Sequence, residues 1–359
     1  MQIAIVGLPH SGKTTLFQTI TNSFIDESTY QKKEENKAIV KVPDKRLDLL
    51  SDMFKPKKTT YATIEIVDLA GQQKVEGKNP FTDNFLSKVK NNDALLHVVR
   101  GFRDDTYPFE DGSVNLERDI DTLETEFILS DMTIFETRVE RLTKQIQKIN
   151  NDEAKKELSI VSQWLEALQN NIPLRNLDFS EEEKKYLKIF QPLTAKPLLI
   201  ALNLEETKVQ ESEKIVKDLT NKYNSKNLKI SAFFAKIEME LAQLPEEEAK
   251  VFMNDYGIKE SALNRLIADA YDLLGLQSFF TVGEDECRAW TIKKGYTAQE
   301  AAAVIHSDFY NTFIRAETVG YDDFIACGSF AKCKEKGLFR LEGKEYIVKD
   351  GDILSIRHS

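Results

Sequence analysis

The stretch GLPHSGKTTLF, which runs from Gly7 to Phe17, decides the fold of this chain. It follows MQIAIV, a short apolar run that predicts a buried strand over residues 2–6, and a helical pattern begins at Thr14. A strand, the pattern G-x-x-x-x-G-K-[ST] and a helix together are typical of a loop that holds phosphate. Its glycines let the backbone wrap closely around a phosphate, and the amino end of the helix adds about half a positive charge.

The polar residues of this loop have expected roles. Lys13 would contact the β- and γ-phosphates of a nucleotide, and the hydroxyl of Thr14 would ligate Mg²⁺. His10 is expected near the nucleotide with its backbone N–H contributing, whereas a direct catalytic role would predict a titration of kcat at about pH 6 to 7. The loop residues predicted to bind the nucleotide are Pro9, His10, Ser11, Gly12, Lys13, Thr14 and Thr15.

A second phosphate-sensing element, DLAG at 68–71, ends another buried-type strand. It fits the D-x-x-G pattern of P-loop switch proteins. We expect Asp68 to hold Mg²⁺ through water and the N–H of Gly71 to sense the γ-phosphate.

The sequence NLEE at 203–206 ends a later strand, where guanine-specific proteins carry N-K-x-D. Leu204 replaces the Lys of that pattern and Glu206 replaces its Asp with a longer arm, which makes a poor guanine clamp and favours adenine. Ser231 and Ala232 are predicted to form the loop that covers the base. The alternative is that Asn203 and Glu206 are plain polar residues of a loop.

Five apolar runs predict buried strands of a parallel sheet. Helical patterns lie between them, which indicates a doubly wound α/β fold covered on both faces. His97 is expected to be a buried core residue of the third strand. The predicted strands cover residues 2–6, 63–71, 94–102, 196–203 and 226–234.

The gap between the third and fourth strands is far longer than a crossover connection needs. Its apolar residues alternate in steps of four and three, which predicts two helices of an antiparallel coiled coil joined by a turn at 150–152. The seam residues of the first helix are Ile128, Met132, Phe135, Val139, Leu142, Ile146 and Ile149, and those of the second are Leu158, Val161, Leu165, Leu168 and Ile172.

After about residue 275 the pattern changes to short alternating runs with glycine turns. Only residues 297–313 are helical in pattern, with Thr297 as the N-cap, and the sequence DGD at 350–352 predicts a tight turn between two strands. This indicates a small α+β domain. The predicted domains are a P-loop nucleotide-binding domain over 1–115 and 192–275, a coiled-coil insert over 116–191 and a small domain over 276–359.

Composition and charge further limit the class of protein to which this chain can belong. The chain has 359 residues, of which 41% are hydrophobic and 30% charged, and a net charge of −10. This charge argues against non-specific nucleic-acid binding, so no DNA partner is expected. No apolar run of 18 residues is present and a strand pattern follows Met1 directly, so we expect no membrane span and no signal peptide. The three cysteines form no C-x-x-C pair, which together with these features favours the cytoplasm.

The order of these motifs resembles the Obg-like ATPase (YchF) family over essentially the whole chain. The resemblance is carried by GLP-x-x-GKTTLF, VPDKRLDLL at 42–50, VDLAG at 67–71, HVVRGF at 97–102, NLEE, LQSFFTVG at 276–283, RAWTIKKG at 288–295, AAAVIHSDFYNTFIRAETV at 301–319 and EGKEYIVKDGDIL at 342–354.

The resemblance implies several properties. The family prefers ATP to GTP and associates with ribosomes, and its last domain is a TGS domain with a ubiquitin-like β-grasp fold. Such a domain implies a contact with RNA or protein. The combined expectation is a cytoplasmic, Mg²⁺-dependent P-loop ATPase that hydrolyses ATP slowly as a switch. The alternatives are a GTPase of the same fold and a nucleotide-gated binding module with negligible hydrolysis.

The chain departs from the family at three places. Gln72 follows the D-x-x-G glycine where the family has a hydrophobic residue, and residues 102–114 lack the family's catalytic histidine. The family's switch segment, which precedes residues 42–44, corresponds to roughly residues 31–33 of this chain. The Mg²⁺-binding threonine is absent from that place, unless Ser28 or Thr29 substitutes. One hypothesis is that Gln72 replaces the histidine and orients the attacking water, as in Ras-like GTPases. The alternative is that Gln72 is a solvated residue and turnover is very slow.

Overall fold

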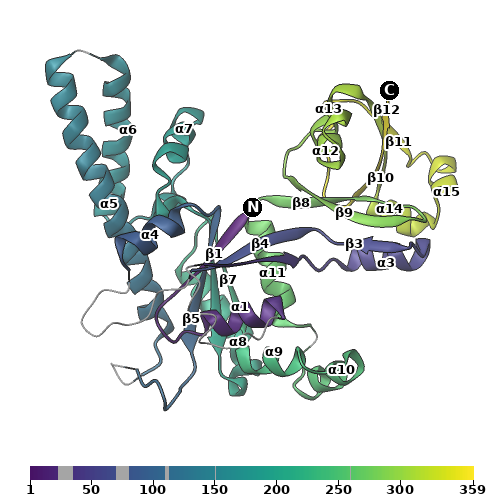
Figure 1. The fold of residues 1–359 in the computed structure, drawn as a ribbon, viewed down its shortest axis with the longest axis horizontal. Coiled ribbons are helices and arrows are strands. Elements are labelled where there is room, and N and C mark those ends of the chain that lie inside the picture. Colours follow the sequence, from purple (N-terminus) through teal and green to yellow (C-terminus); the bar gives the residue numbers. More distant parts are fainter. Residues whose placement is uncertain (23–34, 70–80, 110–112, 150, 259) are drawn as a thin grey trace. The chain divides into compact units, whose positions relative to one another are not determined.

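The computed structural model describes residues 1–22, 35–69, 81–109, 113–149, 151–258 and 260–359 (Figure 1). The chain forms two compact units, Met1–Ala38 with Glu65–Leu273 and Ile39–Ile64 with Leu274–Ser359. The predicted boundaries placed residues 39–64 in the nucleotide-binding domain. They group instead with the C-terminal residues because β3 (Lys58–Thr60) pairs in parallel with β9 (Glu286–Lys293).

A six-stranded sheet in the order β2-β4-β1-β5-β6-β7 forms the centre of the first unit. The five predicted strands are confirmed, and their neighbouring pairs β4-β1, β1-β5, β5-β6 and β6-β7 are all parallel. The edge strand β2 was not predicted. The strands are β1 (Gln2–Val6), β2 (Asn36–Lys41), β4 (Thr63–Asp68), β5 (Ala94–Gly101), β6 (Leu198–Leu204) and β7 (Leu228–Phe233).

Helices cover this sheet because its strands are apolar on both faces, as the near-continuous burial of β5 and β6 shows. Helices α8 and α11 pack against β7, and α1 packs against α9. His97 lies in β5 with 1% of its surface exposed, which confirms a buried core residue, but its Nε2 has no hydrogen-bond partner among the described residues, so the expected satisfied histidine is wrong. Burial lowers the pKa of His97 to about 3. The helices are α1 (Lys13–Thr21), α4 (Asp83–Lys90), α8 (Ser212–Lys222), α9 (Ala235–Leu241), α10 (Glu246–Asp255) and α11 (Ala262–Leu273).

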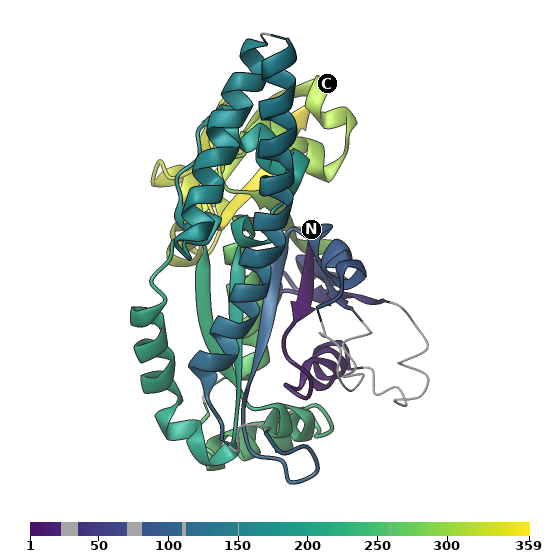
Figure 2. The ribbon, with the colours of Figure 1, turned by 90° about the vertical axis from the view of Figure 1, so that its left-hand side faces the viewer.

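The insert is an antiparallel helical hairpin of α5 (Leu116–Lys148) and α6 (Asp152–Gln169), which lie side by side in Figures 1 and 2. Its core holds Ile128 and Phe135 of the first predicted seam and Val161 and Leu168 of the second, but both seams are wrong at their last residue. Trp164 is buried at 1% exposure, and it was not assigned to the seam. Ile149 and Ile172 lie beyond the helix ends and are exposed at 68% and 41%.

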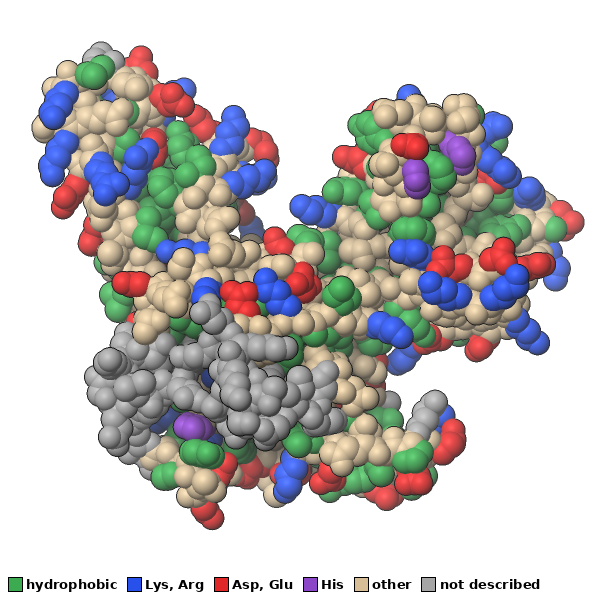
Figure 3. All heavy atoms as spheres, viewed as in Figure 1, with side chains coloured by type: hydrophobic (Ala, Val, Ile, Leu, Met, Phe, Trp, Pro, Cys, Tyr) green, Lys and Arg blue, Asp and Glu red, His purple; other side chains and the backbone are tan. Residues whose placement is uncertain are grey.

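The outer face of the hairpin is polar. Figure 3 shows lysine and arginine side chains interspersed with acidic ones over this part of the molecule, and Lys144–Glu140 and Lys155–Asp152 are examples of its ion pairs. Such mixed charge is typical of a solvated helix surface. No helix in the described ranges is long and apolar enough to span a bilayer.

The chain returns from the hairpin to the sheet through η1 (Leu174–Asn176), α7 (Glu181–Phe190) and η2 (Leu193–Ala195). Arg175 is 2% exposed; its Nη1 donates to both carboxylate oxygens of Glu124 at 2.8 Å, and its Nε donates to the carbonyl of Lys196 at 3.0 Å. This side chain therefore joins α5 to the start of β6.

The second unit contains a six-stranded sheet in the order β11-β10-β12-β8-β9-β3. Thr297 is the N-cap of α12, as predicted, and forms a capping box with Glu300, which was not predicted. The expected helix over 297–313 is interrupted at His306. Remaining elements are α3 (Lys45–Phe54), β8 (Leu276–Thr281), α12 (Ala298–Ile305), α13 (Asp308–Thr312), β10 (Phe313–Gly320), α14 (Tyr321–Cys327), α15 (Phe330–Glu335), β11 (Arg340–Glu342) and β12 (Asp352–His358).

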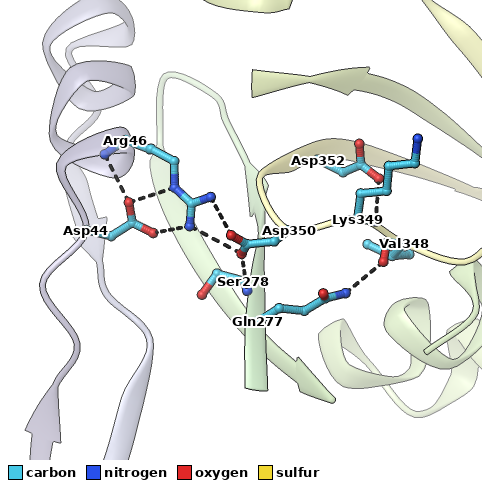
Figure 4. A network of polar contacts seen from close by, with 8 residues as sticks. All are labelled: Asp44, Arg46, Gln277, Ser278, Val348, Lys349, Asp350 and Asp352. Carbon is cyan, nitrogen blue, oxygen red and sulfur yellow. Dashed lines mark hydrogen bonds and ion pairs between the residues drawn. The ribbon is translucent and has the colours of Figure 1, made fainter. Parts of the chain in front are cut away.

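An arginine joins the two pieces of this second unit (Figure 4). The guanidinium of Arg46 donates to Asp350 at 2.8 Å from Nη1 and to Asp44 at 2.8 Å from Nη2. Asp350 also accepts from the N–H of Ser278 at 3.0 Å. The turn at 350–352 is therefore held from both sides. Of the two strands predicted around this turn, only the second is present, as β12; an isolated bridge at Ile347 stands in place of the first.

Replacing Arg175 tests how the insert is held. Arg175→Met leaves the Glu124 carboxylate without its cation and the Lys196 carbonyl without its donor, so we expect a loss of about 3 kcal/mol in the free energy of unfolding. Urea unfolding followed by circular dichroism measures it. Lys184→Met, which removes an exposed pair with Glu181, is the control and should leave the unfolding midpoint unchanged. Equal midpoints for both variants would contradict the prediction.

Candidate functional site

The phosphate loop lies between the end of β1 and the start of α1, where two glycines allow close contacts. Gly7 has φ 149° and Gly12, the N-cap of α1, has φ 96°. A Cβ on Gly7 would lie 2.4 Å from the carbonyl oxygen of Val98, and one on Gly12 would lie 2.4 Å from Nδ2 of Asn203. A larger side chain at either position would therefore push the loop away from the sheet.

Lys13 folds back over this loop from the first turn of α1. Its Nζ donates to the carbonyl of Leu8 at 2.7 Å and to that of Gly7 at 3.1 Å. Burial lowers the pKa of Lys13 to about 8, and the nearby negative charge of Asp68 opposes this shift. An ammonium group held this way is available to an anion that reaches the loop.

Two oxygen ligands suited to Mg²⁺ lie close to Lys13. Asp68 is the last residue of β4, is 3% exposed and pairs in register with Ile5 of β1, while Thr14 follows Lys13 in α1. Mg²⁺ in nucleotide sites commonly takes one or two such protein oxygens together with phosphate and water. The residues present therefore fit the ion. Within the described ranges, no group of three or more His, Cys, Asp or Glu side chains forms a metal cage.

Asn203 connects the phosphate loop to a segment that follows β7. Its side chain is 2% exposed; Nδ2 donates to the carbonyl of Ser11 at 3.2 Å, and Oδ1 accepts from the N–H of Ala235 at 3.2 Å. Asn203 is therefore a buried bridge between the phosphate loop and the start of α9, and its role in nucleotide binding stays a prediction.

The other residues of the NLEE motif make different contacts. Leu204 is 5% exposed and ends β6, and Glu205 accepts from the N–H of Arg103 at 2.9 Å. Glu206 forms an ion pair with Lys236 at 2.8 Å, and this hydrogen bond holds the pKa of Glu206 below its usual value.

The prediction that Ser231 and Ala232 form a loop after the fifth strand is wrong. Both lie inside β7, where they pair with Ala201 and Leu202 of β6, and they are 3% and 1% exposed. The residue that contacts the Asn203 side chain is Ala235, the first residue of α9, because β7 itself extends to Phe233.

The structure also shows contacts that the sequence patterns did not indicate. The Tyr107 ring stacks on the His10 ring with 4.0 Å between centroids and 15° between planes. Lys236 was likewise not assigned to the site. Gly71 and Gln72 lie outside the described residues, as do Ser28, Thr29 and the segment 31–33, so their roles remain predictions.

Comparison with known proteins agrees with this geometry. Residues 2–163 match a family model described as 50S ribosome-binding GTPase, and residues 276–359 match one described as YchF-GTPase_C, protein of unknown function (DUF933). The chain is 43% identical to the ribosome-binding ATPase YchF of Bacillus subtilis (strain 168), with 98% of both chains covered. It is 40% identical to the protein of that name from Pasteurella multocida (strain Pm70), again over 98% of both.

The fold agrees as well. The structure of the YchF GTPase of Schizosaccharomyces pombe superposes with a TM-score of 0.87 at 30% identity and covers 99% of this chain and 97% of its own. The match extends through the P-loop unit, the helical insert and the C-terminal residues. The resemblance predicted from the sequence is confirmed, and the chain belongs to the YchF family.

Proposed function

We propose that this protein is a cytoplasmic P-loop ATPase that hydrolyses ATP slowly, works as a nucleotide-dependent switch and associates with the ribosome. The observation that carries the proposal is the phosphate loop, in which Lys13 lies over the loop carbonyls beside Asp68. The names of the relatives, ribosome-binding ATPases, support the activity and the partner.

The base-side residues favour adenine over guanine. A guanine clamp needs a carboxylate that accepts from two N–H groups of the base, and the carboxylate of Glu206 is already engaged by Lys236 at 2.8 Å. Leu204 is an apolar residue buried at the end of β6 and supplies no amine to that loop. Both features weaken binding of GTP relative to ATP.

Each residue of the site has a distinct role in the binding and hydrolysis of ATP. The backbone N–H groups of the phosphate loop and Lys13 bind the phosphates and stabilise the negative charge that spreads over the transferring phosphoryl group. Thr14 and Asp68 would hold Mg²⁺, which supplies further positive charge to the β- and γ-phosphate oxygens. Asn203 keeps the phosphate loop and the segment after β7 at a fixed spacing, so that phosphates and base are bound together.

Two surfaces are candidates for the ribosome contact. The mixed-charge hairpin of α5 and α6 is one, and the C-terminal unit, which we propose to be TGS-like, is the other, through RNA or protein. We expect the segments around residues 25–40 and 70–80, which lie largely outside the described residues, to respond to the γ-phosphate and so control which surface is presented.

Nucleotide titration tests the base preference. Calorimetry should give tighter binding of Mg²⁺-ATP than of Mg²⁺-GTP, and the double change Leu204→Lys with Glu206→Asp should shift the ratio toward GTP by about tenfold. A Lys208→Met variant, which removes a surface pair with Glu211, is the control. Tighter binding of GTP by the unchanged protein would instead establish the GTPase alternative.

Lys13 predicts a pH dependence of binding. Its pKa of about 8 in the free protein lies below the usual 10.5, and a bound triphosphate favours the charged amine, so binding above about pH 8 requires uptake of a proton. The Kd for ATP should therefore rise between about pH 8 and 10, approaching tenfold per pH unit.

Calorimetry at about pH 9 in two buffers of different ionisation enthalpy measures the proton uptake. Lys13→Arg should abolish it, since a guanidinium stays charged at that pH. Binding without proton uptake by the unchanged protein would contradict the lowered pKa of Lys13 on which this prediction depends.

Hydrolysis is tested at Gln72. If Gln72 orients the attacking water, Gln72→Ala should lower the single-turnover rate of ATP hydrolysis at least about tenfold, with and without ribosomes, while Gln73→Ala should not. An unchanged rate removes Gln72 from the mechanism. ATP binding without measurable turnover, even with ribosomes, would favour the nucleotide-gated binding module.

A further inference from the structure

The loop over residues 102–109, which lacks the family's histidine, is anchored at its ends and contacts the phosphate loop through Tyr107. At its start, the N–H of Arg103 donates to Oε1 of Glu205 at 2.9 Å. The N–H of Thr106 donates to Oδ1 of Asp104 at 2.9 Å, which turns the chain before Tyr107. The loop therefore reaches from the NLEE motif toward the phosphate loop.

Arg100 anchors both ends of this loop. It is 5% exposed at the end of β5, and its Nε donates to the carbonyl of Phe102 at 3.2 Å. Its guanidinium carbon lies 5.0 Å from the ring centre of Phe102 and 4.1 Å from that of Phe109, within the range of cation–π contacts. With its two ends fixed on one buried cation, the loop has a defined place above the site.

Tyr107 is the residue that this loop brings to the phosphate loop. Its ring stacks on His10 with the planes 15° apart and the centroids 4.0 Å apart. His10 has φ 60°, in the left-handed region that side chains with a Cβ seldom adopt. Asparagine, aspartate and histidine are the side chains that adopt it most often, and contacts from the surrounding structure offset its cost.

We propose that Tyr107 is a positioning residue for nucleotide binding: by stacking on His10 it holds the phosphate loop in the left-handed turn that aims the loop N–H groups at phosphate. The inference rests on the proposed function in taking a nucleoside triphosphate as the ligand. It goes beyond that function because it makes the affinity for phosphate depend on a loop that starts beside Glu205, on the base side of the site.

The stack connects two parts of the site. Since Arg103 contacts Glu205 and Tyr107 contacts His10, the loop connects the base-reading segment with the phosphate loop by a route separate from Asn203. Loss of the tyrosine ring should loosen the phosphate loop while leaving the Asn203 bridge in place. Loss of only its hydroxyl should have no effect, because the ring makes the stack.

The first test needs no nucleotide. Hydrogen–deuterium exchange of the full chain should show that Tyr107→Ala raises amide exchange in a peptide covering residues 7–14 by about threefold, whereas Tyr107→Phe does not. Tyr310→Ala, which removes a tyrosine of similar exposure (45% against 47%) in the other unit, is the control. Unchanged exchange in Tyr107→Ala would overturn the proposal whatever the protein binds.

The second test is a double-mutant cycle with His10→Asn. Tyr107→Ala should weaken Mg²⁺-ATP binding by about threefold to tenfold in the unchanged background, with a rise in KM and little change in kcat. In the His10→Asn background the same change should cost less than about twofold, since that background already lacks the imidazole ring on which Tyr107 stacks. An equal cost in both backgrounds would overturn the proposal.

The two hypotheses fail differently. If the unchanged protein binds neither ATP nor GTP, the proposed function fails, and the exchange experiment still decides whether Tyr107 positions the phosphate loop. If it binds ATP and the cycle shows no coupling between Tyr107 and His10, the positioning role fails and the proposed function stands.

Discussion

The close approach of the phosphate loop to the sheet is the constraint on which the rest of the site depends. At Gly7 and Gly12 there is no space for a Cβ, because the Val98 carbonyl and the Asn203 amide lie 2.4 Å from the positions it would occupy. This approach brings the Ser11 carbonyl within reach of Asn203, and a loop held further out would lose that contact. The contacts of Lys13 with the carbonyls of Gly7 and Leu8 are made within the loop itself.

Burial of polar groups at the carboxyl ends of the strands gives the site its chemistry. In an open parallel sheet these ends share one edge, so Asp68 at the end of β4 and Asn203 near the end of β6 lie around the phosphate loop. Polar groups removed from water must find partners, and each partner also positions the group. The same burial that orients Lys13 lowers its pKa to about 8, which couples its charge to whatever anion it meets.

Local patterns predicted much of the fold. The phosphate loop, the five parallel strands and the helical hairpin follow from residue types that lie close together in the sequence. The period of each strand or helix places its apolar residues on the faces that become buried. The prediction failed where an assignment needs a partner from elsewhere. Trp164 enters the hairpin core only because α5 faces it with Phe135, at 5.6 Å between ring centroids. Residues 39–64 join the second unit through Arg46 and Asp350, which are 304 residues apart.

The sequence by itself determined that this chain binds nucleotide phosphates, that it belongs to a P-loop family and which residues follow each strand, because these properties depend on local order. Only the tertiary structure decided which residue meets the Asn203 side chain: it is Ala235, whereas Ser231 pairs with Ala201 inside the sheet. The tertiary structure alone placed Tyr107 on His10, a stack between residues 97 positions apart that no periodicity encodes. The phosphate loop is a local motif, but the contacts that hold its shape come from distant strands and loops, and these exist only once the sheet has assembled.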